Sequence, residues 1–175
     1  TKILHAIPMK LFHTARNQMD VVRLHGDMTR VHELGWIKKG NEAKLFWAGD
    51  QPYPSSDPSQ KCRWTKFRVN GKAAPMCVHA QSDTVSNFIV THGRWRDCDQ
   101  LSTMWATTDS TKTYVEIGAN IGACMMQMLL MTDASDIRVF EPNPVNLFCL
   151  TSTLLALQPE QRRRVMVYPL ALGER

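Results

Sequence analysis

The stretch that decides the fold is TYVEIGANIGA, residues 113–123. Its first five residues are mostly β-branched, aromatic or apolar, which predicts a strand over residues 113–117. Gly118 permits a sharp turn and Gly122 a close approach of the next segment, because glycine has no Cβ. The apolar run of residues 123–131 predicts a buried helix. The segment therefore predicts a strand, a glycine turn and a helix in succession.

Two more strands are predicted downstream. Residues 137–140 (IRVF) form the first, and EPNP directly after it breaks the strand and starts a helix. Asn143 can cap that helix and Pro144 suits its first position, where a missing N–H costs nothing. The helix is expected to reach about residue 157, and residues 165–168 (VMVY) form the last strand. Alternating strands and helices predict an α/β fold with a parallel sheet.

The segment before this pattern predicts a hairpin and two helices. Residues 64–69 and 76–79 are β-like, and Asn70-Gly71 after the first run is a strong turn cue, because both residues tolerate positive φ. The intervening residues predict a loop longer than two residues. Asp83 is predicted to cap one helix rather than to act as a base, and a second helix is expected over residues 97–105.

Composition and spacing divide the chain into three parts. Residues 1–60 predict an irregular or partly helical arm, which ends in the Pro- and Ser-rich linker of residues 51–58. Residues 61–110 hold the hairpin and the helices that precede the core. Residues 111–175 hold three strands and their helices.

The overall composition excludes several classes of protein. The chain has 175 residues, 43% of them hydrophobic and 21% charged, which is ordinary globular usage. No apolar run reaches the roughly 18 residues of a membrane-spanning helix. The net charge is +5, and the basic residues are scattered along the chain. The run of three arginines at residues 162–164 is expected to be a solvated helix end, so no nucleic-acid partner is predicted. The six histidines form no pattern of metal ligands, and no metal is expected.

The five cysteines contain no CxxC pair, and an odd number cannot all be paired. This pattern favours free thiols in a reducing intracellular compartment, either the cytosol or an organelle interior. The cysteines are Cys62, Cys77, Cys98, Cys124 and Cys149.

The glycine turn and two acids predict a particular ligand. A pyrophosphate site would prefer a glycine where Asn120 stands. Glu116 before the turn instead suits a cationic group, such as an α-amino group. Glu141 follows the second strand, where an acid can accept both ribose hydroxyls. A cationic group and a ribose together indicate S-adenosylmethionine.

At these residues the chain resembles the FkbM-type class I S-adenosylmethionine-dependent methyltransferases. The resemblance is carried by VEIGANIG (115–122), VFEPNP (139–144) with the helix after it, HAQSDTVSNFIVTHGRW (79–95) and VMVYPLALGER (165–175), and it covers residues 60–175. It implies a Rossmann-like methyltransferase sheet, incomplete at the C-terminus, behind an N-terminal arm and hairpin. The cofactor pocket would be lined by Glu116, Gly118, Asn120, Gly122, Glu141 and Asn143.

The same resemblance implies methyl transfer to a hydroxyl oxygen of an acceptor. It names no catalytic base; His79 and His92 are candidates for that role. Arg96 stands where the family usually has an acid. We expect the first strand, residues 113–117, to need further sequence or a protein partner along its open edge, so that the 175-residue chain alone is inactive. The alternative is a non-catalytic, methyltransferase-like structural subunit of a larger assembly.

Overall fold

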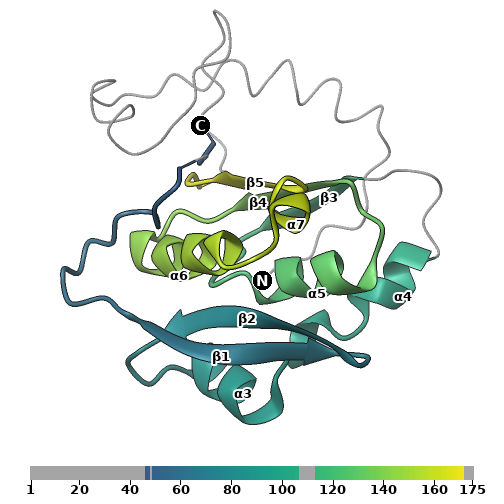
Figure 1. Cartoon of the computed structure of the whole chain (residues 1–175), viewed down its shortest axis with the longest axis horizontal. Helices are drawn as coiled ribbons and strands as arrows, with labels where there is room; N and C mark the ends of the chain where they lie inside the picture. The colour runs from purple at the N-terminus through teal and green to yellow at the C-terminus, as the bar shows by residue number, and fades with distance from the viewer. Residues whose placement is uncertain (1–45, 48, 107–112, 172–175) are drawn as a thin grey trace, which may run out of the picture.

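The computed structural model describes residues 46–47, 49–106 and 113–171, and these form a mixed α/β structure. It contains a two-stranded antiparallel sheet and a three-stranded parallel sheet. Helices α5 (Ala123–Met131) and α6 (Pro144–Leu155) lie between the two sheets, and α3 (Thr84–His92) lies on the far side of the antiparallel sheet (Figure 1). The predicted α/β class with a parallel sheet is therefore confirmed. Most of the predicted arm, residues 1–45, lies outside the described residues.

The parallel sheet forms where the sequence predicts it. Its strands are β3 (Thr113–Ile117), β4 (Asp136–Phe140) and β5 (Val165–Tyr168), in the order β3-β4-β5. The connecting helices are α5 (Ala123–Met131), α6 (Pro144–Leu155) and the short α7 (Pro159–Arg162). Asn143 caps α6 by accepting a hydrogen bond from the Val145 amide, and Pro144 occupies the first turn, as predicted.

The antiparallel sheet is a hairpin of β1 (Cys62–Val69) and β2 (Lys72–His79). Val69 pairs with Lys72, so the connecting loop has only Asn70 and Gly71. The expectation of a longer loop is therefore wrong. Both loop residues adopt positive φ, 46° and 73°, which matches the right-handed twist of the strands and lets pairing continue to the turn.

The helices after the hairpin are shorter than predicted in one place. Asp83 caps α3 (Thr84–His92) through bonds from two backbone amides, as expected. The helix expected over residues 97–105 is instead split into a 3₁₀ turn, η1 (Arg96–Cys98), and α4 (Leu101–Ala106).

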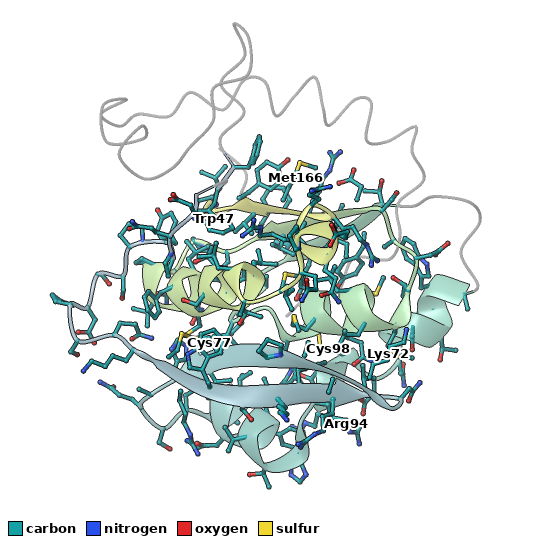
Figure 2. All side chains as sticks on the ribbon, viewed as in Figure 1. Trp47, Lys72, Cys77, Arg94, Cys98 and Met166 are labelled. Atoms are coloured by element: carbon teal, nitrogen blue, oxygen red, sulfur yellow. A yellow bond between two sulfur atoms is a disulfide. The ribbon has the colours of Figure 1, made fainter. Side chains whose placement is uncertain are left out.

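The main core lies between the parallel sheet and the hairpin, around α5 and α6. All residues of α5 except the last are buried, so its methionines fill the core as expected for flexible apolar side chains. On the hairpin side, the Cys77 amide donates to the Thr153 hydroxyl of α6 at 3.0 Å. Cys77 lies on the hairpin strand nearest α6 (Figure 2). The hairpin is therefore packed into the same core as the sheet.

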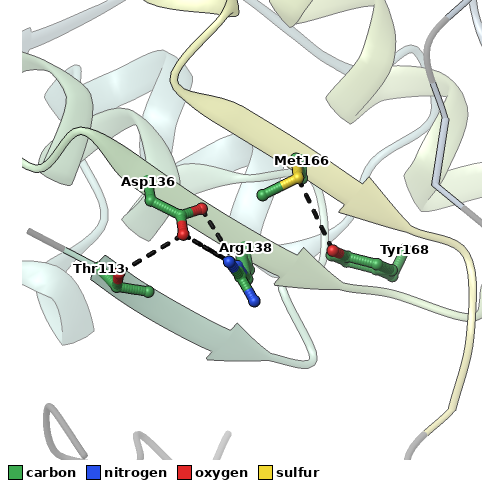
Figure 3. A network of polar contacts seen from close by, with 5 residues as sticks. All are labelled: Thr113, Asp136, Arg138, Met166 and Tyr168. Carbon is green, nitrogen blue, oxygen red and sulfur yellow. Dashed lines mark hydrogen bonds and ion pairs between the residues drawn. The ribbon is translucent and has the colours of Figure 1, made fainter. Parts of the chain in front are cut away.

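The other face of the parallel sheet carries half-buried side chains (Figure 3). Arg138 pairs with Asp136, at 2.6 Å between Nη2 and Oδ2, and the Thr113 hydroxyl lies 3.4 Å from the same carboxylate. Next to them the Tyr168 hydroxyl donates to the Met166 sulfur. Neighbouring positions on each strand alternate between this face and the core, as the pleat requires.

Four of the five cysteines are paired, which corrects the expectation of free thiols. Cys62 bonds to Cys77 across the hairpin, and Cys98 of η1 bonds to Cys124 in the first turn of α5. Only Cys149 is a free thiol, and it is buried. The pairs are 15 and 26 residues apart, so only the folded chain brings them together. The basis for expecting a reducing compartment is thereby removed.

The two edges of the parallel sheet differ. Among the described residues β3 pairs with β4 alone, in line with the expected open edge. At the other edge Trp47 forms an isolated antiparallel bridge to Val167 of β5, so the end of the arm joins the sheet. The described helices include none long and apolar enough to cross a membrane.

The expectation that residues 162–164 form a solvated helix end is wrong for Arg164. Its guanidinium donates to the carbonyls of Leu129, Thr132 and Ala134. These carbonyls lie at and just after the C-terminus of α5, where a cation is favoured by the helix dipole. Arg164 therefore caps α5, the helix that follows the glycine turn.

Candidate functional site

The glycine turn and Glu141 lie side by side at the C-terminal edge of the parallel sheet. The amides of Gly118 and Ala119 both donate to the carbonyl of Phe140, the last residue of β4. The ends of β3 and β4 are therefore joined at the backbone. In open parallel sheets this edge is where ligands bind.

The Glu141 carboxylate ties the turn to the start of α6. One oxygen accepts from the Asn120 amide at 2.7 Å, and the other accepts from the Asn143 amide at 2.9 Å and the Asn146 side-chain amide at 3.3 Å. The residue is only 5% exposed. A carboxylate offers about four acceptor positions, so three are filled and one remains.

Asn120 adopts a left-handed conformation with φ of 53°, and its side chain accepts from the Ile121 amide at 2.7 Å. Asparagine tolerates this conformation better than most residues. Asn120 therefore shapes the turn in two ways, and its own amide contacts the Glu141 carboxylate.

The two glycines of the turn serve different purposes. A Cβ at Gly118 would meet nothing within 4 Å, so this glycine faces open space. A Cβ at Gly122 would lie 3.1 Å from Met125 and 3.2 Å from Leu150. Both residues have positive φ, 79° and 87°. Gly118 therefore leaves room for a ligand, whereas Gly122 lets α5 pack closely on α6.

Glu116 lies on the core side of the sheet, apart from the open space at Gly118. It is 7% exposed and accepts hydrogen bonds from the Tyr114 side chain and the Met125 backbone. Burial, together with the smaller effect of the nearby Glu141 charge, raises its pKa to about 8. Its second oxygen is buried without a hydrogen-bond partner. Glu116 therefore acts first as a cap for the N-terminus of α5, which has no side-chain cap of its own.

A polar network that the sequence did not predict reaches this site from the hairpin. His79, at the end of β2, lies 3.0 Å through Nε2 from the Asn146 side-chain oxygen. Its Nδ1 lies 3.2 Å from the Gln60 side-chain nitrogen and 3.5 Å from the Cys149 sulfur. Asn146 in turn donates to Glu141. The chain positions are too far apart for any sequence pattern to indicate this network.

Cys149, His79 and Asn146 are connected in the same way as the cysteine, histidine and asparagine of a nucleophilic cysteine site. The Cys149 thiol is nevertheless unsuited to act as a nucleophile. Cys149 is fully buried, and its burial raises its pKa to about 12. A reactive cysteine needs the thiolate form and access to substrate. The network is therefore not a nucleophilic centre.

Other groups of polar side chains among the described residues are weaker candidates for a binding site. A cavity of about 560 Å³ beside the hairpin turn is lined by Arg68, Lys72 and Arg94, among others. Arg94 is paired with Asp99, and Lys72 donates to the Leu130 carbonyl at the far end of α5 from the glycine turn. The described residues contain no group of three or more potential metal ligands.

The sequence-predicted residues thus separate into two sets. Gly118, Asn120, Glu141 and Asn143 lie together at the edge of the sheet, while Glu116 and Gly122 lie behind it in the core. Of the two candidate bases, His79 joins the network and His92 lies on the surface helix α3, its ring against Phe88. In comparisons with known proteins, no family model, curated protein or solved structure matches this chain.

Proposed function

We propose that this chain is the cofactor-binding part of an S-adenosylmethionine-dependent methyltransferase with a Rossmann-like sheet. The observation that carries the proposal is the position of Glu141. Its carboxylate lies at the end of β4, 2.7 Å from the Asn120 amide of the glycine turn, beside the open space at Gly118. An acid at the end of the second strand, next to a glycine turn, is the arrangement that holds a ribose in nucleotide-binding sheets.

The residues present fit the ribose end of the cofactor. One acceptor position of Glu141 is free for a ribose hydroxyl, and Gly118 leaves room above the turn. Asn120 and Asn143 orient the carboxylate through their backbone amides. The cofactor would supply the methyl group on its sulfonium, and the acceptor would be a hydroxyl oxygen.

The fit of the amino end depends on Glu116. Its unpartnered oxygen and raised pKa mark a carboxyl group that lacks a cation. The α-amino group of the cofactor would provide that cation and favour the ionised form. The Glu116 carboxyl group is buried, so the amino group of the cofactor could contact it only at the first turn of α5. We therefore assign Glu141 as the principal contact and Glu116 as the secondary one.

A second candidate function is a non-catalytic, methyltransferase-like subunit that binds protein partners. It is favoured by the extent to which Glu141 and Glu116 are already bonded within the protein. In this function the two acids only hold the turn in shape. The open edge of β3 would then be covered by a partner strand.

Calorimetric titration of the full chain with S-adenosylhomocysteine separates the two functions. We expect binding, and we expect Glu141→Ala to weaken it by about 1.5–3 kcal/mol, the contribution of hydrogen bonds to a charged acceptor. Glu160→Ala, an exposed acid in α7, is the matched control and should leave affinity unchanged. Absence of binding by the full chain would support the structural subunit.

A further inference from the structure

The hairpin reaches the proposed site through His79, whose ring contacts Asn146, the α6 residue that donates to Glu141. This histidine ends β2 and is held there by its backbone amide, which donates to the Ser86 hydroxyl at 3.1 Å. Its ring nitrogens contact α6 on one side and Gln60 on the other. The ring therefore connects Gln60 at the end of the arm, the hairpin and α6, the helix that follows Glu141.

The Glu141 carboxylate sets the direction of the hydrogen bonds that Asn146 makes. An ionised carboxylate only accepts, so Asn146 must direct its NH₂ group toward Glu141. The Asn146 oxygen then faces His79 Nε2, which must carry a proton in order to donate. In the neutral ring Nδ1 is left as an acceptor, and the Gln60 side-chain NH₂ donates to it at 3.2 Å. This one tautomer satisfies the contacts of the ring with both Asn146 and Gln60.

We infer that His79 is a positioning residue for the cofactor site, acting through Asn146 on Glu141. Without the donor at His79 Nε2, the Asn146 amide can rotate and withdraw its hydrogen from Glu141. Glu141 would then lose one of three bonds that fix its orientation toward Asn120. This role rests on the proposed function for its effect on cofactor binding, but its effect on the turn does not depend on it.

The test uses the full chain and three variants. His79→Ala removes the donor, His79→Gln keeps an N–H that can reach Asn146, and His92→Gln is the control on the surface helix α3. Two quantities are measured: the NMR shift of the Asn120 amide proton, which reports its bond to Glu141, and the affinity for S-adenosylhomocysteine. A merely structural role for the ring would not be rescued by glutamine.

We expect His79→Ala to shift the Asn120 amide and to lower the affinity roughly 2- to 10-fold, the effect of one hydrogen bond. His79→Gln should restore both toward wild type, and His92→Gln should change neither. An unchanged Asn120 amide in folded His79→Ala, or equal behaviour of the alanine and glutamine variants, would overturn the inference.

Two further outcomes are also decisive. If the wild-type chain binds no S-adenosylhomocysteine, the proposed function fails. The role of His79 is then tested by the NMR shift of the Asn120 amide proton alone. If His79→Ala does not fold, long-range ¹H–¹⁵N correlation on the wild-type chain replaces it. The contacts predict the tautomer with the proton on Nε2, and the tautomer with the proton on Nδ1 would overturn the inference.

Discussion

Two turns in this protein use the same residue types and differ in what surrounds them. Asn70 and Gly71 of the hairpin, and Asn120 and Gly122 of the sheet turn, all have positive φ. A Cβ at Gly71 would meet nothing within 4 Å, and the strands on both sides determine that turn. The sheet turn is held instead by the Glu141 carboxylate. A turn that needs a buried acid to shape it is a better candidate for a ligand site than one that does not.

The largest expected effect comes from the disulfides, one in each region. Replacing Cys62 and Cys77 together by alanine should lower the free energy of unfolding by about 3 kcal/mol, from the loss of a cross-link over 15 residues. Replacing Cys98 and Cys124 should cost about 3.5 kcal/mol, since that loop spans 26 residues. Urea unfolding measures both.

These losses also differ by region. The Cys98–Cys124 bond anchors the helix behind the sheet turn, so its loss should weaken cofactor binding as well as stability. Loss of the hairpin bond should affect stability more than binding. Equal stability of the oxidised and reduced chains would contradict the assigned pairing.

The next effect compares the two glycines directly. Gly122→Ala adds a Cβ 3.1 Å from Met125 at a positive φ, so strain and overpacking together should cost roughly 2–4 kcal/mol. Gly71→Ala meets no neighbour and should cost only the strain, about 1 kcal/mol. Thermal unfolding of both variants checks the difference. Equal costs would mean that the sheet turn is no more constrained than the hairpin turn.

A smaller effect should depend on pH. The folded-state pKa of Glu116, about 8, lies above the ordinary value of 4.5. The protonated folded form is favoured, so its contribution to stability is complete below about pH 4.5 and is lost as pH rises toward 8. The slope is at most about 1.4 kcal/mol per pH unit. Glu116→Gln should flatten stability over this range, whereas Glu160→Gln, at an exposed acid, should not.

The opposite result would also be informative. If the wild-type chain instead keeps its stability between pH 5 and 8, and gains stability only as the pH rises toward about 4.5 in a way that Glu116→Gln abolishes, the carboxylate is ionised in the folded protein. Glu116 would then have a cationic partner or more solvent contact than its burial implies.

Local features of the sequence predicted most of the elements. The strand at residues 113–117, the helix after the glycine turn and the caps at Asp83 and Asn143 all depend on neighbouring residues, and the structure confirms them. The predicted length of the hairpin loop is wrong because that length depends on strand pairing, which composition does not determine.

Features that join distant residues could not be predicted. The disulfides, the cap that Arg164 provides for α5, and the contact of His79 with Asn146 link positions 15 to 67 residues apart. Nothing in the local pattern distinguishes Cys149 from the paired cysteines. For the site, the sequence indicated Glu116, Glu141 and the glycine turn as a group, but it could not show that Glu116 is buried beneath the first turn of α5.

We propose that the sheet turn, and not the hairpin turn, binds the cofactor. The most direct measurement is a ¹H–¹⁵N titration of the full chain with S-adenosylhomocysteine, which observes the backbone amides of both turns in one sample. We expect saturable shifts at Gly118, Asn120 and Glu141, with Asn70 and Gly71 unchanged. Absence of shifts at the sheet turn, or shifts confined to the hairpin, would contradict it.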